Sequence, residues 1–156
     1  MKRTVYISGP ISDPATGQPR EGWQKDFLEA EARLRAMGFY VINPVDIAQE
    51  VDDAFKWRGN FITGPSAWDG KPIQPTRADY IMACLQRIQM NYAYGCLHGV
   101  YVIGGHQQCK DSYGVRMEVI LASLLGVPVY SDFLGNRINS KFVEIDGNIQ
   151  DLLTED

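Results

Sequence analysis

Glu118 is an acidic residue whose sequence context could support chemistry. It lies in a segment with helical spacing that is otherwise largely apolar from Val119 to Leu125. Side chains on a helix lean toward its amino end, so this carboxylate points back toward the start of the helix. Gly114, at position i−4, has no side chain to cover it. The pattern predicts a half-buried carboxylate below an open shelf, and the alternative is a solvent-facing glutamate beside Arg116.

The start of the same helix is suited to binding a small anion. Ser112 or Asp111 can cap it, and the first backbone N–H groups of a helix have no partner within the helix. Such groups favour a phosphate.

Two predicted strands end in turns that contain glycine. One turn is Ser8, Gly9 and Pro10, and the other is Gly104 and Gly105. Each leads into a loop before a helix. We expect both turns to open onto one crevice, because ligands of parallel sheets bind at the carboxyl ends of the strands.

Strands and helices alternate along the chain. Near-continuous apolar runs predict strands at 5–7, 39–42, 100–103 and 127–130, and helical spacing predicts helices at 23–38, 77–89 and 112–125. Asp46 is predicted to cap a further short helix. In the helix at 77–89 the inward side chains are predicted to be Tyr80, Ala83, Leu85 and Ile88. The pattern indicates an α/β fold with a parallel sheet covered on both faces.

Two segments lie outside this alternation. Residues 57–75 lose periodicity and gather glycine, proline and aromatic residues, which predicts a lid loop over a site, or alternatively a disordered insertion. Residues 132–156 are expected to form a C-terminal tail. The whole chain, 1–156, is predicted to be one domain, since 156 residues with 45% hydrophobic content can bury one core.

The net charge and the cysteine and histidine content limit what the protein is expected to bind. A net charge of −4 argues against binding a nucleic acid polymer, although backbone dipoles can still bind a small anion. Cys84, Cys96 and Cys109 show no C-x-x-C pairing, and His98 and His106 have no ligand spacing around them, so neither a disulfide framework nor a metal site is predicted. No signal peptide or membrane span is evident, so we expect a cytoplasmic location.

Three segments, in this order, resemble the nucleoside 2-deoxyribosyltransferase-like superfamily, especially its small phage and prophage members. They are YISGPIS followed by AEARLRAMGFYVINP, then RADYIMACLQRI, then the S-x-G-x-x-x-E pattern that ends at Glu118 and is followed by LGVPVY. The resemblance implies a flavodoxin-like three-layer fold with a mainly parallel sheet of four to five strands. It also implies cleavage or transfer at the N-glycosidic bond of a 2'-deoxynucleoside or its 5'-monophosphate, without a cofactor.

The resemblance also implies roles for particular residues. Glu118 matches the nucleophile of the family, and Tyr6 matches the tyrosine that orients it. Ser112 stands where the nucleotide hydrolases have a serine that contacts the 5'-phosphate, which favours a monophosphate over a nucleoside. The full set of predicted substrate-binding residues is Ser8, Gly9, Pro10, Gly104, Gly105, His106, Ser112 and Gly114.

One departure from the family pattern affects the leaving base. The family has an aspartate where this chain has Cys84, and a thiol is a poor general acid. Asp79, Asp111 or Asp69 are the candidates to replace it, with Asp79 included among the predicted catalytic residues. His106 could also serve as a base contact or proton donor.

The sequence is also compatible with two other functions. A nucleotide-binding or sequestering protein without useful catalysis is the second hypothesis, supported by Cys84, and a scaffold is the third. Relatives of this kind form homodimers or larger homo-oligomers, and Asn136 and Asn139 are possible donors to the site of a neighbouring subunit.

Overall fold

The computed structural model describes residues 2–13, 15–61, 74–104, 112–132 and 145–154. Along the chain the elements are β1 (Thr4–Ser8), α1 (Trp23–Ala36), β2 (Tyr40–Ile42), α2 (Pro44–Phe61), α3 (Arg77–Ala93), β3 (Gly99–Val102), α5 (Tyr113–Leu125), β4 (Val129–Ser131), β5 (Gly147–Asn148) and α6 (Asp151–Thr154).

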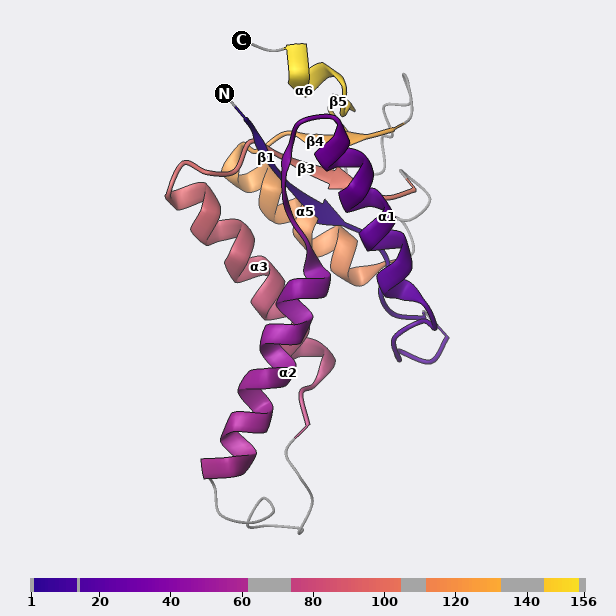
Figure 1. Ribbon diagram of the computed structural model, residues 1–156, viewed down its shortest axis with the longest axis vertical. Helices are drawn as coiled ribbons and strands as arrows, with labels where there is room; N and C mark the ends of the chain where they lie inside the picture. The colour runs from indigo at the N-terminus through magenta and orange to yellow at the C-terminus, as the bar shows by residue number, and fades with distance from the viewer. Residues whose placement is uncertain (1, 14, 62–73, 105–111, 133–144, 155–156) are drawn as a thin grey trace.

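The five strands form one sheet in the order β2-β1-β3-β4-β5, and every pair is parallel (Figure 1). This order and the helices on both faces confirm the predicted α/β, flavodoxin-like three-layer fold. The chain runs from β1 outward to β2 and then returns to the other side of β1 to form β3. The crossovers therefore diverge at the carboxyl ends of β1 and β3, where folds of this kind bind ligands.

Alternate side chains of the strands enter two hydrophobic cores, one on each face of the sheet. Val5 and Ile7 of β1 pack in one core with Phe27 of α1 and Leu152 of α6. Tyr6 of β1 faces the opposite way, into the core formed with α3 and α5. Figure 1 shows α1 and α5 on opposite sides of the strands. The side of the sheet that carries Tyr6 is thus also the side that carries Glu118.

The buried face of α1 is the one predicted, whereas the buried face of α3 differs in part. In α1 the buried residues are those predicted, namely Trp23, Phe27, Ala30 and Leu34. In α3, Ile88 is buried as predicted, but Cys84 is the other buried residue, and Tyr80, Ala83 and Leu85 are only partly buried. Because α3 packs against both α2 and α5, its buried stripe follows two neighbours rather than the sheet alone.

The predictions for the segment after β2 were wrong in two respects. The helix is long, continuing to Phe61, and its first turn is capped by Asn43, whose Oδ1 accepts a hydrogen bond from the Val45 N–H at 3.0 Å. Asp46 lies inside the first turn instead. Proline at the first helical position needs no donor, so the Asn43-Pro44 pair starts a helix rather than only ending a strand.

The prediction of a lid loop at 57–75 is wrong for residues 57–61, which are helical. Residues 57–61 belong to α2, residues 62–73 lie outside the described residues, and residues 74–76 lead into α3. Figure 1 shows α2 lying beside α3 and extending away from the sheet. An ion pair between Glu50 and Arg87 and a hydrogen bond from the Tyr80 hydroxyl to Asp52 join the two helices. These long-range contacts hold the middle of α2 against α3.

The segment predicted to be a tail also contributes to the fold. It supplies β5, the fifth strand, and the buried side chains of Ile145, Ile149 and Leu152. Asn136 and Asn139 lie outside the described residues.

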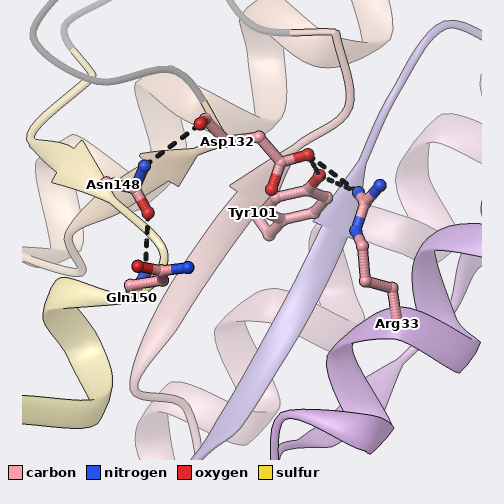
Figure 2. A network of polar contacts seen from close by, with 5 residues as sticks. All are labelled: Arg33, Tyr101, Asp132, Asn148 and Gln150. Carbon is pink, nitrogen blue, oxygen red and sulfur yellow. Dashed lines mark hydrogen bonds and ion pairs between the residues drawn. The ribbon is translucent and has the colours of Figure 1, made fainter.

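A polar network holds this C-terminal segment against the rest of the molecule (Figure 2). Arg33 of α1 donates to the carboxylate of Asp132 at 2.8 Å, and the Tyr101 hydroxyl of β3 donates to the same carboxylate. The Asn148 side chain donates to the Asp132 carbonyl at 3.0 Å, and Asn148 in turn accepts from the Gln150 N–H. The network links α1 and β3 to β5 and the end of β4.

Gly99 lies where the side chains of Tyr130 and Leu152 leave no room for a Cβ atom. A Cβ at Gly99 would lie 2.8 Å from Tyr130 Cε2 and 3.2 Å from Leu152 Cδ2. Gly99→Ala should therefore overpack the core and destabilise the protein by about 1–3 kcal/mol in urea unfolding. Gly114→Ala is the control, because its Cβ would meet nothing closer than 3.9 Å. Equal stability of the two variants would contradict the packing seen at Gly99.

Candidate active site

A cavity of about 590 Å³ lies beside the carboxyl end of β1. Its walls come from the turn after β1, the loop and first turn of α1, one face of α2, the segment leading into α3 with the first half of that helix, and the first half of α5. The cavity therefore lies next to the point where the crossovers from β1 and β3 diverge, as the sheet order requires.

Glu118 lines this cavity from α5 and is only 6% exposed. Its Oε1 accepts a hydrogen bond from the Ser8 hydroxyl at 3.4 Å, and its Oε2 is buried with no partner among the described residues. A Cβ on Gly114 would lie 3.9 Å from Oε1. The open shelf predicted above Glu118 is confirmed, and the solvent-facing alternative is wrong.

Burial changes the ionisation of Glu118. Desolvation raises its pKa to about 8, and the neighbouring Tyr6 and Ser8 hydroxyls oppose the shift without cancelling it. At neutral pH Glu118 is thus largely a protonated carboxylic acid. Such a shift is typical of functional carboxylates in apolar pockets.

Tyr6 lies next to Glu118, as predicted for an orienting residue. It is fully buried, and burial together with the neighbouring Glu118 and Cys84 raises the pKa of its hydroxyl well above the ordinary value. The hydroxyl completes no well-aligned hydrogen bond with any described residue. It therefore stays protonated and remains available as a donor near the carboxylate.

Cys84 lines the same cavity, from α3. Burial and the neighbouring Glu118 raise the pKa of its thiol to about 12, although Tyr6 and Arg87 act in the opposite direction. The thiol is thus neutral over the physiological range. Cys84 occupies a place from which an acid could reach a substrate, but it supplies no acid there.

Three of the predicted substrate-binding residues line the cavity, namely Gly9, Ser112 and Gly114. The Ser112 side chain caps α5 by accepting from the Val115 N–H at 3.3 Å. Ser112 rather than Asp111 is therefore the cap, and Asp111 lies outside the described residues.

Gly9 has a packing role in addition to its place in the cavity wall. A Cβ there would lie 3.0 Å from Phe27 Cζ and 3.2 Å from Ile103 Cδ1. The glycine therefore lets α1 and the end of β3 close over the end of β1, on the side away from Glu118.

Two other residues of the opening turn are engaged elsewhere. Ser8 is fully buried, does not line the cavity and donates to Glu118, so it positions the carboxylate rather than touching a ligand. The Pro10 carbonyl accepts from Arg20 Nη2 at 2.7 Å.

The remaining predicted residues lie outside the cavity wall or outside the described residues. Asp79 closes a capping box with Thr76 at the start of α3, and its Oδ2 accepts from the Thr76 N–H at 2.7 Å. Gly104 is exposed, with φ of 75°, and does not line the cavity. Gly105, His106 and Asp69 lie outside the described residues.

Sequence reasoning missed an acidic residue that lines the cavity. Asp52 of α2 accepts a hydrogen bond from the Tyr80 hydroxyl of α3, and both side chains line the cavity. Pro44 and Ala48 precede Asp52 at one-turn intervals and line it as well. This spacing would have identified the inner face of α2 if the helix had been predicted at its true length.

His98 makes a backbone contact outside the cavity wall. Its Nδ1 accepts from the Thr4 N–H at 3.0 Å, at the amino ends of β1 and β3 and so away from the cavity. Among the described residues, no group of three or more histidine, cysteine, aspartate or glutamate side chains could hold a metal ion. Within the same residues, no helix combines the length and apolar character needed to cross a membrane.

No protein-family model matches the chain, and no curated protein matches it at a significant level.

Proposed function

We propose that this chain cleaves or transfers at the N-glycosidic bond of a 2'-deoxynucleoside 5'-monophosphate or its nucleoside, with Glu118 as the nucleophile. The observation that carries the proposal is a buried carboxylate, with one oxygen unpartnered among the described residues, facing a cavity of about 590 Å³. A cavity of that size can hold a nucleotide.

In the proposed reaction, ionised Glu118 attacks C1' of the sugar while the bond from C1' to the base nitrogen breaks. The electron pair of that bond leaves with the base, which takes up a proton. The carboxylate stabilises the oxocarbenium-like transition state and forms a glycosyl ester, which water or a second base then resolves. Ser8 donates to the carboxylate and positions it. The neighbouring Tyr6 hydroxyl keeps its proton and is available to donate to the oxygen that has no partner among the described residues.

The start of α5 supports a phosphorylated substrate. Ser112 and Gly114 line the cavity there, and the first N–H groups of a helix favour an anion. Arg77 lines the cavity nearby, with its guanidinium 5.6 Å from the ring centroid of Tyr113. Arg77 therefore adds a positive charge next to the proposed phosphate position.

The direct test is to incubate the protein with deoxynucleosides and their 5'-monophosphates and to measure released base by chromatography. Release from monophosphates, lost in Glu118→Gln, would support the proposal. Full activity in that variant would overturn the assignment of the nucleophile.

The raised pKa of Glu118 also predicts how the rate depends on pH. Because the nucleophile must be ionised, the rate of base release should rise with pH and level off above about 8. Initial rates at saturating substrate, from pH 5 to pH 9, test this. A rate that is constant across this range would mean that Glu118 is already ionised in the substrate complex.

Binding without turnover is the second candidate function. The neutral Cys84 thiol at the family's acid position and the protonated Glu118 both favour it. A rise in melting temperature with a nucleotide, but no release of base from any of the substrates, would identify a nucleotide-binding protein.

We further propose that the chain forms a homodimer or larger homo-oligomer in the cytoplasm. Exposed apolar side chains form a stripe along one face of α5, at spacings of i, i+4, i+7 and i+11: Tyr113, Met117, Ile120 and Leu124. A second copy is a suitable cover for such a stripe. A purely monomeric species in sedimentation equilibrium would contradict this proposal.

A further inference from the structure

Asp52 and Tyr80 form a polar pair in the wall of the cavity. Asp52 comes from α2 and Tyr80 from α3, and the Tyr80 hydroxyl donates a hydrogen bond to Asp52 Oδ1. Both side chains are partly exposed and line the cavity. The pair therefore faces the space that a ligand would fill, in addition to joining two helices.

The wall around this pair is suited to a planar ring. Pro44 and Ala48 lie one and two turns before Asp52 on α2, and all three line the cavity. Ile81 of α3 and Trp23 of α1 add apolar surface to the same cavity. A nucleobase could stack against this apolar surface with one edge at Asp52.

The carboxylate of Asp52 restricts which edge of a nucleobase can bind to it. A carboxylate only accepts hydrogen bonds, and its two oxygens offer about four acceptor positions. Tyr80 occupies one of these positions. Burial and the neighbouring Asp52 raise the pKa of Tyr80 to about 12, so the Tyr80 hydroxyl keeps its proton and stays a donor to Asp52. A ligand at the remaining positions must present N–H groups, and a carbonyl oxygen would be repelled.

We propose that Asp52, held in place by Tyr80, selects nucleotides whose base carries an amino group. The best fit is the edge of a 2-amino-6-oxopurine, where a ring N–H and the amino group lie side by side and can donate to both carboxylate oxygens. Thymine and uracil, which lack an amino group, bind weakly. This inference rests on the proposed function, because it takes the ligand to be a nucleoside or nucleotide.

The test measures base preference rather than activity alone. Dissociation constants of 2'-deoxyguanosine and thymidine 5'-monophosphates are determined by calorimetry in a Glu118→Gln background, which prevents turnover. The guanine nucleotide should bind about tenfold or more tightly than the thymine nucleotide, as expected for a bidentate contact. Adding Asp52→Asn should reduce that ratio to near unity, because an amide both donates and accepts.

A matched control separates base recognition from helix packing. Glu50→Gln removes another contact between α2 and α3, the ion pair with Arg87. Glu50 does not line the cavity. The substitution should leave the binding ratio unchanged. Tyr80→Phe should weaken the preference without reversing it, and it serves as the second variant if Asp52→Asn does not fold, as judged by its melting curve.

Different results would overturn base selection by Asp52 and the proposed function. If no nucleotide binds, the proposed function is overturned. If nucleotides bind but the parent shows no preference for the amino-bearing base, or if neither Asp52→Asn nor Tyr80→Phe lowers it, the role of Asp52 is overturned and the proposed function stands. If Glu50→Gln lowers the preference as much as Asp52→Asn does, Asp52 acts only by joining the helices.

Discussion

Glu118→Gln should reduce the rate of base release by about 10³-fold or more while leaving the fold intact. The reason is that an amide of nearly the same shape cannot form the glycosyl ester, and removing a nucleophile has effects of at least this size in other enzymes. Because the Glu118 carboxyl is already largely neutral at pH 7, the neutral amide should be accommodated without strain. Single-turnover rates of base release, together with circular dichroism spectra, would measure both parts of the prediction.

The control for this prediction is a glutamate far from the cavity. Glu29 is exposed on α1, paired with Lys25, so Glu29→Gln should retain the parent rate. A loss confined to Glu118→Gln would identify the buried carboxylate as the reacting group. Equal rates for both variants would remove Glu118 from the mechanism.

The same substitution should change how stability depends on pH. The folded protein holds the Glu118 proton up to about pH 8, whereas the unfolded chain releases it near the ordinary value of 4.5. The folded state therefore binds more protons between these values, and the free energy of unfolding falls as pH rises through this window. At about 1.36 kcal/mol per unit of pKa, the loss is of the order of 5 kcal/mol once pH exceeds 8.

Glutamine does not titrate, so the free energy of unfolding of Glu118→Gln should not fall with pH in this window. The variant should be close to the parent in stability near pH 5 and clearly more stable at pH 9. Urea unfolding of both proteins at pH 5, 7 and 9 would measure the difference. A difference that is the same at all three values would show that burial does not raise the pKa of Glu118 in solution.

Local rules predicted the fold well. The buried face of α1, the Ser112 cap of α5 and the strands β1 to β4 all follow from apolar spacing and capping residues within a few positions of each other. Glu118 could be placed by the same rules, because residues at i−4 and i share one face of a helix. The parallel sheet then follows from strict alternation of strands and helices.

Long-range contacts account for the errors. The predicted loop at 57–75 began inside α2 because the contacts that α3 makes with this helix cannot be predicted from local sequence, and β5 is a two-residue strand that pairs with β4. Asp79 was a candidate acid by its place beside Tyr80, but the capping box at the start of α3 engages its carboxylate.

The sequence by itself determined the strands β1 to β4, the helices α1, α3 and α5, and their order, because periodicity, capping and turn chemistry act over a few neighbouring residues. Only the tertiary structure decided that Glu118 is desolvated enough to hold its proton, and that Asp52 meets Tyr80 in the cavity wall. Desolvation and pairing depend on side chains from β1, α2, α3 and α5, which lie far apart in the chain and come together only when the sheet and its two helical layers assemble.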